Sequence, residues 1–87
     1  MMTAYERSDI IHIMKMNGSI LSDSDTAQLQ FNTQSKGNNY QIIIMSVEDS
    51  PTVIIKQNDA VLFNDTVKSV DDLKIFLEER LYKYFDI

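Results

Sequence analysis

The sequence predicts an α+β fold, in which an antiparallel four-stranded meander lies between an N-terminal and a C-terminal helix in the order α-β-β-β-β-α. Apolar residues recur at helical spacing near each end of the chain, which indicates an amphipathic helix at each end. Between them, apolar and polar residues alternate with the period of about two that is typical of strands. The connections are too short for parallel crossovers, so neighbouring strands are expected to run antiparallel.

The N-terminal helix is expected over residues 4–16. Thr3 and Glu6 have the spacing of a capping box, in which each side chain accepts a hydrogen bond from the backbone N–H of the other residue. Asn17-Gly18 supplies a stop signal after the last apolar residues. The polar segment 19–25 that follows is expected to be a loop.

Two β-hairpins are predicted next. The expected strands cover residues 26–34, 39–47, 53–57 and 60–63. Residues 35–38 have turn chemistry, and Asn58-Asp59 can take the positive φ angles of a tight type I′ turn. A loop of two residues in the second hairpin would place Ile55 opposite Leu62.

The C-terminal helix is predicted over residues 70–84, with Ser69 and Asp72 in capping positions. Its apolar stripe consists of Val70, Leu73, Phe76, Leu77, Leu81 and Tyr84. Several predicted strands carry apolar residues on both faces, and two arrangements explain this. Either the helices cover opposite faces of the sheet, or both pack on one face and leave the other as an exposed patch for a partner.

Composition limits the classes of function. The 87 residues permit a single domain over residues 1–87. With no cysteine and one histidine, the chain lacks the usual ligands of zinc sites, and we expect no catalytic site, no metal and no cofactor. A calcium loop starting at Asp23 is disfavoured, because Gln28 and Gln34 occupy the positions that require Gly and Glu.

The charge of the chain indicates the kind of partner. Thirteen acidic residues against eight basic ones give a formal net charge of −5. This charge repels nucleic-acid phosphates and anionic membranes, so direct binding to either is not expected, and a basic protein surface is favoured instead. The chain has no secretory signal and no apolar run long enough to span a membrane, which predicts a cytoplasmic protein.

The predicted meander brings strand ends together at one edge of the sheet, and acidic residues flank those ends. Lys36 and Lys56 are expected near the opposite edge. Tyr82 lies beside the apolar stripe of the last helix and is expected to be exposed. The candidate partner-binding residues are therefore Asp23, Asp25, Glu48, Asp49, Asp65, Asp71 and Tyr82.

Three segments carry a resemblance to a known class of proteins. Residues 23–29, 37–42 and 47–50, preceded by the helical Asp9-Ile10-Ile11, resemble the first half of small acidic phage-encoded anti-CRISPR proteins. The second half departs from that pattern, because a hairpin and a mixed-charge helix replace denser acidic runs. The resemblance implies DNA mimicry in the host cytoplasm, in which carboxylates occupy the basic groove of an RNA-guided nuclease.

A different class of function is also compatible with the pattern. If one sheet face is exposed and apolar, the chain is a non-catalytic adaptor or a homodimeric interaction module. Salt-sensitive binding to a basic partner would favour the inhibitor, and self-association would favour the interaction module.

Overall fold

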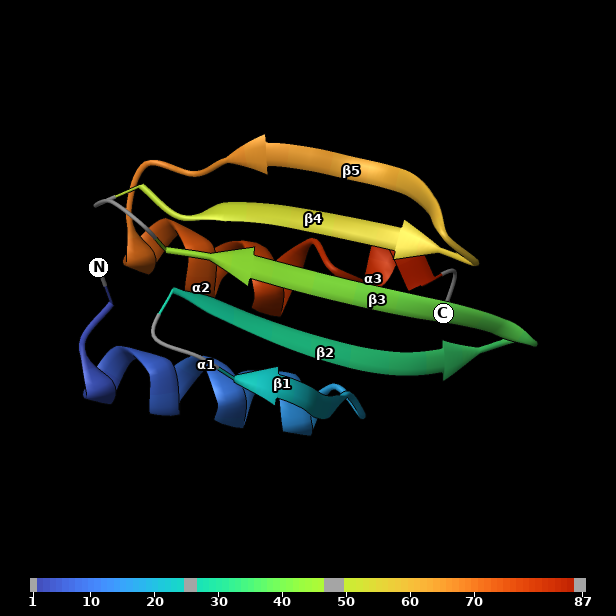
Figure 1. The fold of residues 1–87 in the computed structure, drawn as a ribbon, viewed down its shortest axis with the longest axis horizontal. Helices are drawn as coiled ribbons and strands as arrows, with labels where there is room; N and C mark the ends of the chain where they lie inside the picture. The colour runs from blue at the N-terminus through green and yellow to red at the C-terminus, as the bar shows by residue number, and fades with distance from the viewer. Residues whose placement is uncertain (1, 25–26, 47–49, 86–87) are drawn as a thin grey trace.

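An antiparallel sheet of five strands, in the order β1-β2-β3-β4-β5, forms one layer of the protein (Figure 1). The structure is a computed structural model, and it describes residues 2–24, 27–46 and 50–85. The strands are β1 (Ile20–Ser24), β2 (Gln28–Ser35), β3 (Asn38–Met45), β4 (Thr52–Gln57) and β5 (Ala60–Thr66). The predicted α+β class and antiparallel meander are confirmed, but the sheet has five strands where four were expected.

The additional strand is β1, which falls in the segment predicted to be a loop. It pairs with β2, and its register shifts between Leu21 and Asp23. Leu21 lies opposite Phe31 and packs against the core, whereas Asp23 lies opposite Gln30. The extra residue at this bulge breaks the alternation of side chains, and this is why a short polar edge strand resembled a loop in the sequence.

The N-terminal helix, α1 (Ala4–Met16), has the predicted boundaries and the predicted cap. The Glu6 N–H donates to Thr3 Oγ1 at 3.1 Å, and the Thr3 N–H donates to Glu6 Oε1 at 2.9 Å. Both bonds satisfy backbone donors that have no partner inside the helix. Ile10 and Met14 are fully buried, so this helix contributes one narrow apolar stripe to the core.

The C-terminal helix is shorter than predicted. α2 (Val70–Glu79) begins where expected, with the Asp72 N–H donating to Ser69 Oγ at 3.2 Å, but it ends before the short α3 (Tyr82–Phe85). Leu81, in the break between them, is fully buried. The Leu81 N–H donates to the Phe76 carbonyl at 3.2 Å, so the chain turns out of the helical path while Leu81 stays in the core.

Both helices pack on the same face of the sheet, which decides between the two arrangements that the sequence left open (Figure 1). Their buried side chains belong to one apolar cluster with alternate residues of the central strands. The strand members of this cluster are Leu29, Phe31, Tyr40, Ile42, Ile44, Val53 and Ile55. Burial of each such side chain stabilises the fold by about 1.5–3 kcal/mol.

The other face of the sheet, called the open face here, has no helix over it within the described residues (Figure 1). The pairing register places alternate residues of each strand on it. These are Ile20 and Asp23 of β1, Gln28, Gln30, Asn32 and Gln34 of β2, Asn39, Gln41, Ile43 and Met45 of β3, Thr52, Ile54 and Lys56 of β4, and Val61, Asn64 and Thr66 of β5.

The two ends of the sheet differ in their connections. The turn end holds the β2–β3 turn at Lys36-Gly37 and the β4–β5 turn at Asn58-Asp59, and all of these residues have positive φ as a type I′ turn requires. The loop end is the opposite one, where β2 and β4 begin and β3 and β5 end. α1 and α2 both start at the loop end (Figure 1).

The register of the second hairpin differs from the prediction. Its loop is Asn58-Asp59, as expected, but a bulge at Leu62 places Phe63 opposite Ile55. Phe63 therefore lies on the helical side of the sheet. Its ring centroid is 5.0 Å from that of Phe76 and 5.5 Å from that of Tyr84. Burial of this aromatic group against α2 and α3 explains why the bulged register is preferred to the regular one.

Candidate functional site

The predicted acidic partner-binding residues that the structure describes lie at the loop end. Asp23 is near the end of β1, Asp65 near the end of β5, and Asp71 in the first turn of α2; all are exposed. The other predicted acidic residues, Asp25, Glu48 and Asp49, lie outside the described residues. Tyr82 belongs to α3, which lies toward the turn end, so the structure separates it from these carboxylates (Figure 1). Its side chain is outside the description, so its expected exposure stays a prediction.

The structure brings some of these residues together but separates others. Asp65 and Asp71 flank the connection from β5 to α2. This connection is tied to the start of β4, because the Val67 N–H donates to the Pro51 carbonyl at 2.9 Å. Asp23 lies on the opposite edge strand, four interstrand steps or about 19 Å away across the sheet. The described carboxylates therefore share one end of the molecule without forming one compact cluster.

Positive charge is concentrated toward the turn end. Lys36 and Lys56 lie there as predicted, at the β2–β3 turn and near the end of β4. Lys15, Arg80 and Lys83 lie toward the C-terminal ends of the helices, which point to the same end (Figure 1). Asp59 of the β4–β5 turn and Glu78 and Glu79 at the end of α2 also lie toward this end. The charge of the molecule is therefore only partly polarised along the strands.

Some basic residues lie at the acidic end. Arg7 Nη2 donates to Ser24 Oγ at 2.7 Å, beside Asp23, and Lys68 is exposed between β5 and α2. Lys68 belongs to the connection that returns the chain to α2, so the lysines are not confined to the turn end at which Lys36 and Lys56 were expected. These cations weaken the negative potential of the loop end.

One ion pair links the helices. Lys74 Nζ of α2 donates to Asp9 Oδ2 of α1 at 3.0 Å. The hydrogen bond to Asp9 raises the pKa of Lys74 above that of an ordinary lysine, although desolvation opposes the shift. Lys74 and Glu78 have the i, i+4 spacing of an ion pair along one helix, but the partner that Lys74 contacts is on α1. Because α1 packs beside α2, Asp9 of α1 is within reach of Lys74.

Replacing Lys74 by methionine should remove a pH-dependent contribution to stability. Because the folded pKa is raised, the ion pair contributes fully below the pKa of the unfolded lysine, about 10.4, and its contribution is lost as the pH rises through the folded pKa. We expect the difference in unfolding free energy between wild type and Lys74→Met to be constant at neutral pH and to disappear in strong alkali. Urea unfolding across that range measures it, and a difference that persists would contradict the assignment.

The open face is rich in amide side chains and poor in charge. Ile43 lies at its centre, opposite Gln30 on β2 and Ile54 on β4. Ile43 is 8% exposed, and Ile54 and Met45 are half-buried. The surrounding glutamine and asparagine residues can both donate and accept hydrogen bonds, so this face can bind a polar surface without any charged group.

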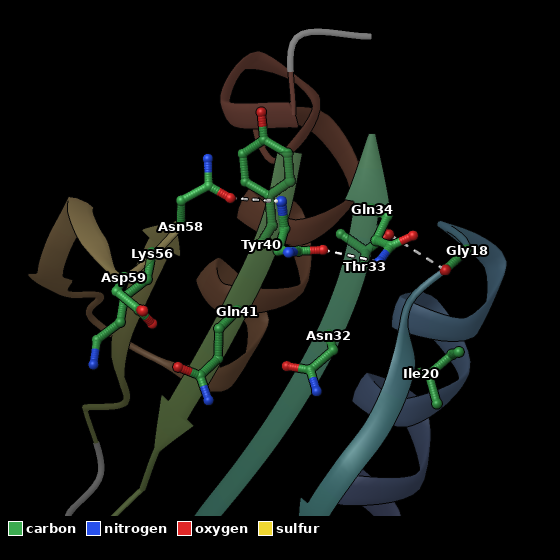
Figure 2. Close-up of a pocket in the computed structure, with 11 residues that line it drawn as sticks. Gly18, Ile20, Asn32, Thr33, Gln34, Tyr40, Gln41, Lys56, Asn58 and Asp59 are labelled. Atoms are coloured by element: carbon green, nitrogen blue, oxygen red, sulfur yellow. Dashed lines mark hydrogen bonds between the residues drawn. The ribbon is translucent and has the colours of Figure 1, made fainter. Parts of the chain in front are cut away.

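A hollow of about 760 Å³ lies at the turn end of the open face (Figure 2). Amide side chains line much of it, and several bond to one another. Gln34 Nε2 donates to Asn39 Oδ1 at 2.8 Å, and Asn58 Oδ1 accepts from the Asn39 N–H at 3.0 Å. Asn58 Nδ2 also donates to Asn38 Oδ1 at 3.0 Å. These bonds tie the β4–β5 turn to the start of β3, so Gln34, Asn39 and Asn58 have a structural role.

The signal for this amide-rich surface in the sequence is the row of Gln and Asn at alternate positions of β2. Such a row is also typical of any strand face that is exposed to solvent, so it does not indicate an interface by itself. His12 is exposed on α1. In the described ranges, no group of three or more His, Asp and Glu residues is arranged to hold a metal ion. No helix there is long and apolar enough to cross a membrane.

Comparison of the chain with protein-family models, with curated proteins and with solved structures gives no match in any of the three.

Proposed function

We propose that this chain is a non-catalytic, protein-binding inhibitor that uses its acidic loop end to occupy a basic, nucleic-acid-binding surface of another protein. The observation that carries the proposal is the polarisation of charge along the strands. Asp23, Asp65 and Asp71 are exposed at the loop end, whereas Lys36 and Lys56 lie toward the turn end.

The polarised charge favours this mechanism in two ways. A field with one sign at one end orients the molecule as it approaches a cationic partner, which raises the rate of productive encounters. Carboxylates held on strands and on a helix start are also positioned more rigidly than those on free loops, so they can occupy sites that a partner keeps for phosphates. The net charge of −5 disfavours direct contact with nucleic acid itself.

The target class comes from the resemblance to small phage-encoded anti-CRISPR proteins. An RNA-guided nuclease holds its duplex in a positively charged channel, and an acidic protein seated there would exclude DNA without any chemical step. In this proposal the protein acts in the cytoplasm of the infected host cell as a stoichiometric DNA mimic.

The proposal is tested with a guide-loaded RNA-guided nuclease and a labelled DNA duplex. We expect the protein to bind the nuclease with an affinity that falls as salt rises from about 0.1 M to about 1 M, because the Debye length shrinks from about 10 Å to about 3 Å. We also expect the duplex to compete with it. Calorimetry measures the first effect and fluorescence anisotropy the second. Binding that neither salt nor the duplex weakens would exclude DNA mimicry.

A further inference from the structure

The open face has the composition of an interface centre rather than of an ordinary solvated surface. Among the described residues of this face, Asp23 and Lys56 are the ionisable ones. The whole chain has 13 acidic and 8 basic residues, so the face is depleted of charge. Ile43, Ile54 and Met45 form an apolar centre inside a surround of amides. Depletion of charge around an apolar centre is typical of protein–protein interfaces.

The size of the face also fits an interface. The Cα atoms extend 34 × 22 × 21 Å, and Figure 1 looks down the shortest of these axes onto the sheet. The Cα extents give the face seen there a projected area of about 750 Å², near the area of about 800 Å² that each partner contributes to a stable interface. A single partner of similar size is therefore sufficient to cover the face.

We propose that the open face packs against the same face of a second copy of this chain, forming a two-fold symmetric sheet-on-sheet dimer. This inference does not depend on the inhibitor function, because it rests on the apolar and amide residues of the open face, and Asp23 is the one described residue that belongs to both surfaces. Two-fold symmetry requires a surface that is complementary to itself. Amides meet that condition because each one can donate to and accept from its copy, whereas a strongly charged face would repel itself.

Charge also selects the orientation of the two copies. If the two-fold axis ran along the strands, each acidic loop end would lie over the other. With the axis across the strands, the loop end of one copy lies over the turn end of its partner, which carries Lys36 and Lys56. The second arrangement replaces repulsion by attraction at both ends, so the strands of the two copies run in nearly opposite directions in an aligned sandwich.

Sedimentation velocity of matched lysine variants tests the dimer. Ile54→Lys places a charge at the centre of the open face, while Ile75→Lys makes the same change at an isoleucine that is 50% exposed on α2. We expect wild type and Ile75→Lys to sediment as dimers and Ile54→Lys to raise the dimer Kd about 30-fold or more. Gln30→Lys, beside Ile43, should act similarly and provides a second readout if Ile54→Lys fails to fold by circular dichroism.

Three results would overturn the dimer: a monomeric wild type, face variants that remain dimeric, or equal dissociation by Ile75→Lys. Nuclease binding of the same variants is measured separately, so a failed dimer and a failed inhibitor give different results.

The orientation is tested with spin labels on Gln28→Cys and Gln34→Cys, which are specific because the chain has no cysteine. In mixed dimers, a 28-to-34 distance shorter than the 28-to-28 distance supports the proposed arrangement, and the reverse excludes it.

Discussion

Replacing Phe31 by alanine should destabilise the protein by about 3–5 kcal/mol, as truncation of a buried phenylalanine does when a cavity remains. Phe31 is 0% exposed and lies in β2 between Leu21 of β1 and Ile42 of β3. Domains of this size are stable by only about 5–15 kcal/mol, so the variant should lose much of its total stability. Urea unfolding followed by circular dichroism measures the change.

The neighbouring residue provides the control for this prediction. Asn32 is exposed on the open face, so Asn32→Ala should change the unfolding free energy by no more than about 0.5 kcal/mol. The contrast between adjacent positions tests which side of the sheet is buried. The measurement is made at concentrations below the Kd of the proposed dimer. Similar losses at both positions would then mean that the open face is covered in the folded monomer, against the arrangement of helices described above.

Reversing charge at the loop end should have the largest effect on function. The double variant Asp23→Lys with Asp65→Lys replaces exposed carboxylates on the two edge strands by ammonium groups. Each replacement adds two units of charge, so the formal net charge rises from −5 to −1. Like charges facing each other cost several kcal/mol, and we expect affinity for the guide-loaded nuclease to fall about 100-fold or more.

A variant of equal net charge separates local from global effects. Glu78→Lys with Glu79→Lys changes two exposed residues at the end of α2 and also gives −1 from −5. We expect this control to lose much less affinity, since these residues lie away from the loop end. Calorimetric titration of both variants provides the comparison. Equal losses would show that net charge governs binding, and the proposed acidic end would then have no special role.

Hydrophobic periodicity and capping residues were sufficient to predict most elements of the fold. α1 and the starts of both hairpins follow from them, because caps, turn residues and alternation act over a few neighbouring positions. The two β-bulges could not be predicted from these local signals. At Leu62, the preference for the bulged register comes from Phe76 and Tyr84, which are distant in sequence from β5.

The side of the sheet on which the helices pack also could not be predicted from the local sequence pattern. An amphipathic helix reveals which of its own faces is apolar, but strands such as β3 carry apolar residues on both sides. The choice depends on how the two helices and the strands fill a common core. It also determines whether Ile43 and Ile54 become interior or surface residues, and therefore whether the chain has a candidate interface at all.

The candidate acidic site was only partly predictable. Strand order alone indicates which connections share an end of the sheet, and it correctly places Asp65 and Asp71 at the same end as Asp23. Lateral spacing depends on the number of strands, and the unexpected β1 moves Asp23 to the far edge. The nearby Arg7 reaches Ser24 through the packing of α1, a contact that sequence spacing does not indicate.

The positions of the two register shifts limit how this protein can assemble. One lies in β1 and the other in the pairing of β4 with β5, so each outer strand of the sheet is distorted. A distorted outer strand does not pair well with a strand of another chain, because its backbone N–H and C=O groups are out of regular register. Lateral growth into a fibril is therefore disfavoured, and in the proposed dimer association through the open face ends once two copies have covered each other.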